Sequence, residues 1–192
     1  MQKFMEIVVE SLNQKLFVYL NSFSGHNKMV DVVVVFMAEY MPFVFIAILF
    51  YLWFTNRKNE ALYAGYATTL GVVLNQIIGL FYYHNRPFMD HLGYTLLAQK
   101  AESSFPSDHT TFTLSIALML LTFKQTRTLG VATVALALIC GVSRVYCGVH
   151  YPFDILGSTI VSIVAVIAIS LLKDKLHGLN IIVISTWKKI FN

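Results

Sequence analysis

The stretch ILGSTIVSIVAVIAISLL, residues 155–172, decides the fold class of this sequence. It carries no charged side chain over its whole length. An apolar helix of about 20 residues is what crosses a lipid bilayer. Four more apolar segments precede it, at residues 29–54, 61–83, 110–123 and 129–146. The sequence therefore predicts an all-α, polytopic membrane helical bundle with five or six transmembrane helices.

The composition agrees with a membrane protein of one domain over residues 1–192. Of its residues 57% are apolar and only 12% are charged, with a mean hydropathy of +0.66. Soluble domains carry about twice that charged fraction. The net charge of +4 is small and is spread over loops. This pattern indicates membrane orientation and contact with anionic membrane lipids, and it argues against nucleic acid as a partner.

The two ends of the chain are expected to lie in the membrane interface. Residues 4–23 place apolar side chains at helical spacing, with Glu10, Asn13 and Gln14 on the other side. Residues 1–25 are therefore expected to contain an interfacial helix rather than a cleavable signal peptide, although a spanning helix stays an alternative. Residues 173–192 are too short in apolar sequence to cross alone and are expected to form a cytoplasmic tail.

The distribution of basic residues predicts the orientation of the chain. One side holds eight of them and the other holds five, when the first helix is taken as interfacial. The eight are Arg57, Lys58, Lys124, Arg127, Lys173, Lys175, Lys188 and Lys189, and the five are Lys3, Lys15, Lys28, Arg86 and Lys100. The polar loops at 84–106 and 147–153 are therefore expected outside the cytoplasm.

Three sequence-distant polar blocks lie on this outer side. They are NRPF (85–88), SSFPSDHT (103–110) and SRVYCGVHYPFD (143–154). Ionisable residues beside spanning segments are costly to place there and are therefore functional candidates. The blocks bring the following side chains to one membrane surface: Arg86, Ser107, His109, Arg144, His150 and Asp154.

These residue types suit phosphoryl transfer. Arginine offers a planar, permanently charged fork that matches phosphate oxygens. Pro106 is a natural first residue of a helix, which would leave the amides of Ser107, Asp108 and His109 unpaired at an anion-binding helix start. Pro152 is expected to open the last span in the same way and to direct a second positive helix end at the site.

The histidines divide the chemical work. His150 and Asp154 are four residues apart, so the carboxylate can hold one imidazole nitrogen and leave the other as a nucleophile. His109 is then free to give a proton to the leaving oxygen. Together with the cations this makes a phosphatase site without metal or cofactor. A metal-dependent hydrolase stays an alternative, because His and Asp also bind metals.

Each residue taken alone also has an ordinary structural explanation. His109 could be a helix cap, Ser103 or Ser104 could cap the third span, and arginines near helix ends often reach toward the interface. The remaining polar candidates and the two cysteines are assigned no chemistry, the cysteines being interpreted as packing residues: His26, His84, His91, His177, Asp31, Glu39, Cys140 and Cys147. The three blocks together favour the functional interpretation.

In order and spacing the three blocks resemble the signature motifs of the type-2 phosphatidic acid phosphatase superfamily, over roughly residues 60–172. The resemblance implies a metal-independent lipid phosphatase with a phosphohistidine intermediate. It makes His150 the nucleophile, Asp154 its orienting residue and His109 the acid. It also assigns phosphate binding to Arg86, Ser107 and Arg144.

Two departures from the family pattern point to one branch. Gly79 stands where the first motif usually has a lysine, and Asp108 stands where the second usually has a glycine. Both resemble the bacitracin-resistance branch, the undecaprenyl pyrophosphate phosphatases. The branch implies a multi-pass protein of the bacterial inner (plasma) membrane, with its site on the periplasmic or extracellular side. Asp108 is then expected to help shape the site for a diphosphate.

This resemblance implies that the substrate is undecaprenyl pyrophosphate, hydrolysed to undecaprenyl phosphate and inorganic phosphate for reuse as the cell-wall lipid carrier. Two alternatives stay open. One is a phosphatase for another lipid phosphate, such as phosphatidate, phosphatidylglycerol phosphate or lipid A. The other is a transporter of phosphorylated lipids that uses the cationic residues for binding only.

Overall fold

The structure is a computed structural model, and it describes residues 2–191. These residues form seven helices and no strand, so the predicted all-α class is confirmed. The helices are α1 (Gln2–Asn21), α2 (Lys28–Phe54), α3 (Lys58–Phe81), α4 (Asp108–Leu121), α5 (Arg127–Tyr146), α6 (Pro152–Leu171) and α7 (Lys173–Phe191).

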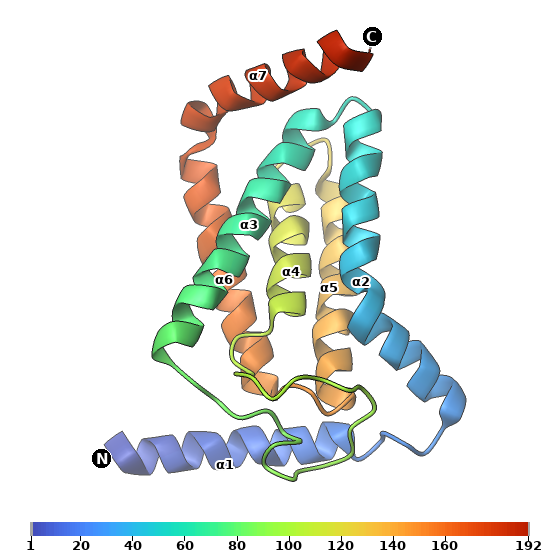
Figure 1. Cartoon of the computed structure of the whole chain (residues 1–192), viewed down its shortest axis with the longest axis vertical. Coiled ribbons are helices and arrows are strands. Elements are labelled where there is room, and N and C mark those ends of the chain that lie inside the picture. Colours follow the sequence, from blue (N-terminus) through green and yellow to red (C-terminus); the bar gives the residue numbers. More distant parts are fainter. Residues whose placement is uncertain (1, 192) are drawn as a thin grey trace.

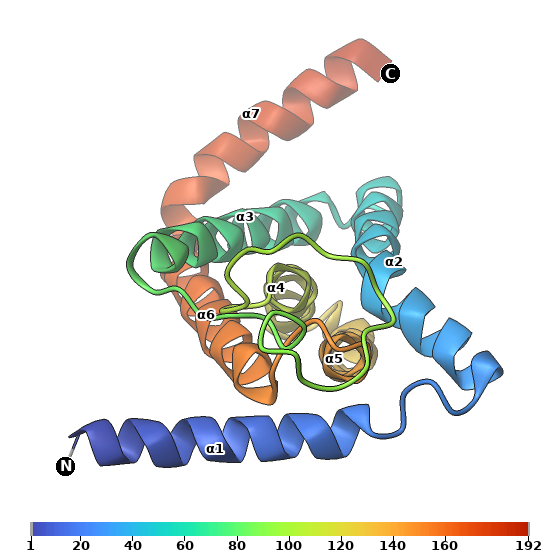
Figure 2. The ribbon, with the colours of Figure 1, turned by 60° about the horizontal axis from the view of Figure 1, so that its bottom comes forward.

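Helix α4 is the centre of the bundle, with α2, α3, α5 and α6 around it (Figures 1 and 2). Within the described residues, those four surrounding helices are long and apolar enough to cross a membrane. Helix α4 has 14 residues and is roughly 21 Å long, shorter than a bilayer core. Of the five or six spans expected, four thus have full length, and the fifth is a short helix enclosed by them.

The inner and outer surfaces of the bundle differ in character. Helix α4 turns hydroxyl-bearing side chains inward, and Thr111 and Ser115 are fully buried. A Cβ atom on Gly71 of α3 would lie 2.9 Å from Ser115 Oγ, so the glycine allows α3 and α4 to approach closely. On the outside, α6 exposes Ile160 and Ile167. An apolar exterior around a small-residue interior is typical of membrane helices.

Helix α1 lies across one end of the bundle (Figures 1 and 2). Its polar face is turned toward the protein, since Asn13 and Asn21 are only 2% and 3% exposed. Its apolar side chains, including Val8 and Leu12, are exposed. A helix with this arrangement fits an interfacial position, with its apolar face in lipid.

Helix α7 crosses the opposite end of the bundle (Figure 1). Tyr66 Oη of α3 donates a hydrogen bond to Asn180 Oδ1 at 2.9 Å, and Trp187 packs edge-on against Trp53 of α2. Of the tail predicted at residues 173–192, the described residues 173–191 therefore form a helix that contacts the bundle. Its cytoplasmic location stays a prediction.

Both cysteines are buried free thiols, as predicted.

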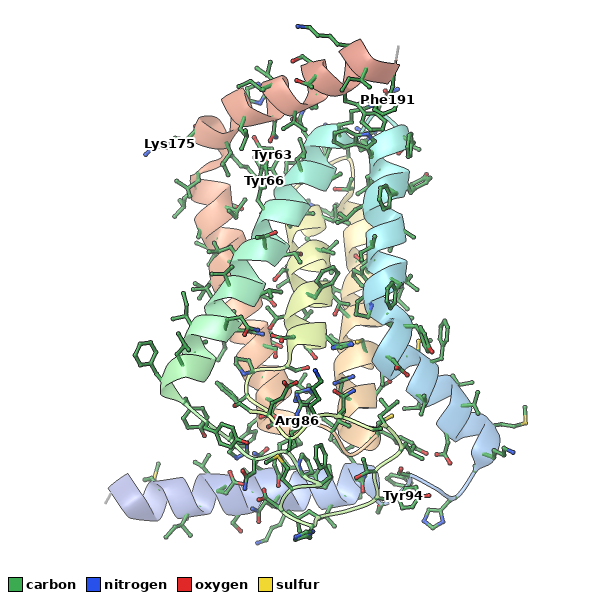
Figure 3. All side chains as sticks on the ribbon, in the orientation of Figure 1. Tyr63, Tyr66, Arg86, Tyr94, Lys175 and Phe191 are labelled. Carbon is green, nitrogen blue, oxygen red and sulfur yellow. The ribbon has the colours of Figure 1, made fainter. Side chains whose placement is uncertain are left out.

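The long polar loop between α3 and α4 covers the α1 end of the bundle, where Arg86 lies among the helix ends (Figures 1 and 3). The loop after α5 passes close to this loop at one point, and that point requires a glycine. Gly148 has a φ of +78°, and a Cβ atom there would meet the carbonyl oxygen of Tyr94.

Candidate active site

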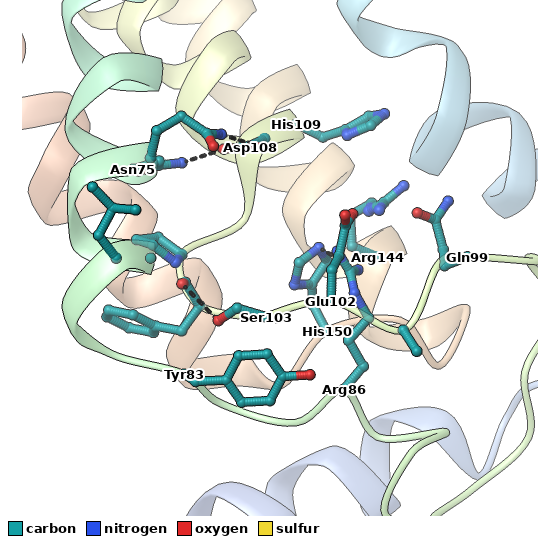
Figure 4. A pocket seen from close by; sticks show the side chains of 16 residues that line it. Asn75, Tyr83, Arg86, Gln99, Glu102, Ser103, Asp108, His109, Arg144 and His150 are labelled. Carbon is teal, nitrogen blue, oxygen red and sulfur yellow. Dashed lines mark hydrogen bonds and ion pairs between the residues drawn. The ribbon is translucent and has the colours of Figure 1, made fainter.

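A cavity of about 540 Å³ opens between α3, α4 and the loops at the α1 end of the bundle (Figure 4). Five of the predicted site residues line it: Arg86, Asp108, His109, Arg144 and His150. The three sequence blocks therefore meet around one space. The remaining two, Ser107 and Asp154, lie behind its wall with 0% and 1% exposure.

His150 follows α5 and is held at both ring nitrogens. Its Nδ1 lies 3.2 Å from Asp154 Oδ2, and its Nε2 lies 3.3 Å from Nη1 of Arg86. A proton on Nδ1 satisfies Asp154 and leaves the Nε2 lone pair facing the arginine and the cavity. Burial lowers the pKa of His150 to about 4, although the bond to Asp154 opposes this. The imidazole is therefore neutral at pH 7, as a nucleophile must be.

The two arginines are buried cations with unused hydrogen-bond donors. Arg86 is 5% exposed and Arg144 only 1%. Arg144 Nη1 donates to the carbonyl oxygen of Ala38 at 3.3 Å, while Nε of each arginine has no partner. A buried charge without a full set of partners is costly unless a ligand completes it. Both guanidinium groups thus favour an anion in the cavity.

Glu102 partly occupies this anion site and was not predicted from the sequence. Its Oε1 accepts from Arg86 Nη2 at 3.3 Å, and its side chain is 60% exposed. Because the Glu102 carboxylate is largely in solvent, its attraction to the buried Arg86 is partly screened. A phosphate group can therefore displace this carboxylate from Arg86 without a large loss.

The start of α4 faces the cavity, but it differs from the prediction. The helix begins at Asp108 with Ser107 as its N-cap, so Pro106 precedes the helix instead of opening it. Serine is common at the N-cap, but here its side chain accepts no hydrogen bond from the amides of the first turn. The amides of Asp108, His109 and Thr110 have no protein acceptor among the described residues.

The start of α6 does not serve the cavity, contrary to the prediction. Pro152 is the first helical residue as expected. However, the amide of Phe153 donates to Asn13 Oδ1 at 3.0 Å, and that of Asp154 donates to the carbonyl oxygen of Tyr151 at 3.1 Å. Because its free amides are already paired, this helix end offers no second anion site.

Asp108 is held by two amide side chains of α3. Asn75 Nδ2 donates to its Oδ1 at 2.8 Å, and Gln76 Nε2 donates to its Oδ2 at 3.4 Å (Figure 4). All three residues line the cavity. Gly79, one turn further along α3, also lines it, and a Cβ atom there would meet nothing within 4 Å. The position at which the family motif usually has a lysine therefore leaves open space in the cavity.

His109 and Ser107 have different positions on the first turn of α4. His109 lines the cavity near the two arginines, and no hydrogen bond within the described structure engages its ring. Ser107 Oγ accepts from Thr110 Oγ1 at 3.1 Å and is fully buried. His109 is thus free to contact a ligand, whereas a phosphate contact by Ser107 stays a prediction.

Behind His150 lies a second layer of polar residues that sequence reasoning missed. Ser104 Oγ donates to Asp154 Oδ2 at 2.7 Å. His84 Nδ1 lies 3.3 Å from Ser104 Oγ, although no function was expected for this histidine. Its position two residues before Arg86 was the only available signal. Among residues 2–191, no group of three or more His, Cys, Asp or Glu side chains is arranged to hold a metal ion.

Comparison with known proteins agrees with the fold and the motifs. Residues 60–177 match the family model of the PAP2 superfamily. The site and the fold define a membrane phosphatase, and the chain belongs to the PAP2 superfamily. It is 35% identical to the undecaprenyl-diphosphatase BcrC of Bacillus subtilis over 94% of both chains.

Two further relatives carry different descriptions. The chain is 29% identical to the putative undecaprenyl-diphosphatase YbjG of Escherichia coli, covering 82% of this chain and 80% of that one. It is 28% identical to a Bacillus licheniformis protein named bacitracin transport permease protein BcrC, covering 88% and 84%.

Among solved structures, Aquifex aeolicus LpxE is similar, with a TM-score of 0.71 and 27% identity over 82% of this chain and 94% of that one. A phosphatidylglycerolphosphate phosphatase from Bacillus subtilis shares the fold, with a TM-score of 0.67 and 17% identity over 88% of each chain.

Proposed function

We propose that the protein hydrolyses undecaprenyl pyrophosphate to undecaprenyl phosphate and inorganic phosphate through a phosphohistidine at His150. The observation that carries this proposal is the placement of His150. Its Nδ1 lies on Asp154 and its Nε2 faces Arg86 beside the cavity. The similarity to BcrC of Bacillus subtilis, which is named an undecaprenyl-diphosphatase, supports the substrate.

In the first step, Nε2 of His150 attacks the terminal phosphorus atom. A nitrogen–phosphorus bond forms, and the bond from that phosphorus to the bridging oxygen breaks. His109 gives a proton to the bridging oxygen, which leaves as part of undecaprenyl phosphate. Arg86, Arg144 and the free amides at the start of α4 stabilise the charge on the transferred phosphoryl group.

In the second step, a water molecule attacks the phosphorus atom of the phosphohistidine. His109 now accepts a proton from that water, the nitrogen–phosphorus bond breaks, and inorganic phosphate leaves. Asp154 stabilises the positive charge that the His150 ring carries while it is phosphorylated, through the Nδ1 hydrogen. No metal or cofactor takes part in either step.

The position of the cavity suits a lipid substrate. It lies at the end of the bundle that α1 covers, and its wall includes the 80% exposed Leu80 at the end of α3. A prenyl chain can therefore leave the cavity past α3 and remain in lipid while the diphosphate reaches the arginines. The basic turns and α7 lie at the opposite end, which supports a site on the outer side of the plasma membrane.

The test is release of inorganic phosphate by purified protein in detergent with excess chelator. The panel contains undecaprenyl pyrophosphate, undecaprenyl phosphate, phosphatidate and phosphatidylglycerol phosphate. We expect the diphosphate to be the preferred substrate and mass spectrometry of quenched protein to find phosphate on His150. Loss of activity in chelator would instead indicate a metal-dependent hydrolase. Preference for a monoester would show that undecaprenyl pyrophosphate is not the substrate.

A transporter is the second candidate because one relative is named a transport permease. Binding alone requires the two arginines but not the contact between His150 and Asp154 at 3.2 Å. A protein that binds the lipid diphosphate but releases no phosphate over many hours would support transport.

A further inference from the structure

We propose that His84 is a positioning residue for this reaction, which connects Glu10 of α1 to Asp154 behind the candidate nucleophile. The inference rests on the proposed function of the same site. His84 lies outside the cavity wall, so it acts through Asp154 and Ser104 and does not touch substrate. Nothing in the family motifs quoted above assigns it a role.

The contacts form one continuous chain. Nε2 of His84 lies 3.2 Å from Glu10 Oε2, and Nδ1 lies 3.3 Å from Ser104 Oγ. Ser104 Oγ then donates to Asp154 Oδ2 at 2.7 Å, and the same carboxylate oxygen lies 3.2 Å from Nδ1 of His150. An interfacial helix is thereby linked to the nucleophile through three intervening side chains.

The direction of the hydrogen bonds follows from the number of donors. Ser104 has one hydroxyl hydrogen, which it gives to Asp154, so its oxygen must accept from Nδ1 of His84. The other ring nitrogen faces a carboxylate, which is also an acceptor. His84 therefore faces an acceptor oxygen at each ring nitrogen and positions the Ser104 hydroxyl through Nδ1.

His84 and Ser104 together position the carboxylate of Asp154. The carboxylate Oδ2 already accepts from Ser104 and from the amide of Tyr151 at 2.7 Å, whereas Oδ1 lies 3.8 Å from Nδ1 of His84. Asp154 must remain a carboxylate to hold the Nδ1 hydrogen of His150 and to stabilise the phosphorylated ring. His84 thus orients the carboxylate through the hydrogen bond to Ser104.

The ring of His84 is fixed by its aromatic neighbours. Tyr82 is stacked on it, with ring planes 8° apart and centroids 6.2 Å apart, and Tyr151 meets it edge-on at 5.1 Å. Its side chain is only 17% exposed. A ring with so little freedom loses little further entropy when it positions another group. The polar face of α1 completes the arrangement by presenting Glu10.

The test compares single variants of the full-length protein in detergent, with undecaprenyl pyrophosphate as the substrate. We expect His84→Ala to lower kcat roughly ten- to a hundredfold, as loss of a hydrogen bond to a charged group does, while KM changes less than about twofold. His84→Asn keeps a donor near the Nδ1 position and is expected to recover most of kcat. His84→Gln reaches toward Glu10 instead and should recover less.

The exposed His26, on a loop at the same end of the protein, provides the matched control, and His26→Ala should retain the wild-type kcat. Glu10→Gln should lower kcat severalfold and offers a second readout if His84→Ala does not fold. A wild-type kcat in His84→Ala, an effect on KM alone, or equal rates for His84→Ala and His84→Asn would overturn the proposal.

The wild-type protein separates this inference from the proposed function. If it hydrolyses another lipid phosphate of the panel instead, the substrate is wrong and the same variants are compared on that lipid. If it hydrolyses none of the panel lipids, both proposals fail. Whenever one of the panel lipids is hydrolysed, the ratio of kcat between His84→Asn and His84→Ala decides the role of the histidine.

Discussion

The starts of α4 and α6 lie close to the same histidine but have opposite electrostatic roles. At α4, the amides of Asp108, His109 and Thr110 have no acceptor within residues 2–191, and Asp108 and His109 line the cavity. At α6, the first-turn amides are paired, and the helix start presents the Asp154 carboxylate to His150. A helix start binds an anion only where its amides are unpaired.

The difference divides the work of the site. In the proposed mechanism, the α4 end and the two arginines provide positive charge for the transferred phosphoryl group. The α6 end would provide negative charge behind His150, whose ring becomes cationic when it is phosphorylated. Variants at the start of α4 and at the start of α6 should therefore affect different parts of the reaction. The largest loss of activity is expected at His150 and the smallest at Asn13, which pairs an amide at the start of α6.

The largest effect is expected for His150→Ala, which removes the proposed nucleophile beside Asp154 of α6. Phosphate release should fall by more than about a thousandfold, since the imidazole held between Asp154 and Arg86 is lost. The measurement is a steady-state phosphate assay on undecaprenyl pyrophosphate. A variant that keeps the wild-type rate would end the phosphohistidine mechanism.

Arg144→Lys should cause the next largest loss, about a hundredfold in kcat/KM. A lysine keeps the charge but lacks the planar fork and the Nε donor that has no partner in the present structure. Arg127→Lys at the far end of the same helix is the matched control and should be unaffected. Equal kinetics of the two variants would show that Arg144 does not bind phosphate.

The pH dependence should report the neutral state of His150. Burial lowers its pKa to about 4, so the reactive neutral form is lost as the pH falls through about 4. We expect the acid limb of kcat/KM to lie near that value, with a loss of about tenfold for each further pH unit below it. An acid limb near pH 6.5 that persists in every other variant would contradict burial as the dominant influence on the pKa of His150.

The membrane class and the three polar blocks were predictable, because long apolar runs and clustered ionisable residues carry their meaning in the sequence alone. The second layer was not. Glu10, His84 and Ser104 come from distant segments, and only the packing of α1 across the bundle brings them together. Whether a helix start is free or paired likewise depends on a distant residue, here Asn13.

Asp108→Gly should have a smaller effect, on substrate preference more than on rate. It restores the usual family residue and removes the carboxylate that Asn75 and Gln76 hold in the cavity. We expect the ratio of diphosphate to monoester hydrolysis to fall roughly tenfold or less. Asp108→Asn, which keeps an oxygen acceptor, is the matched control. A Gly variant with unchanged activity and preference would remove Asp108 from the specificity of the site.

The smallest effect is expected for Asn13→Ala, which removes the side-chain acceptor at the start of α6. The Phe153 amide would lose its 3.0 Å partner in a partly buried place, so stability should fall by about 1 kcal/mol, or roughly 2–4 °C in apparent Tm. Asn13→Asp retains an acceptor and should preserve Tm. Because this amide is paired by protein and not by substrate, KM should not change. A raised KM in Asn13→Ala with an unchanged Tm would mean that both helix starts contact the phosphate, and the division between them would be wrong.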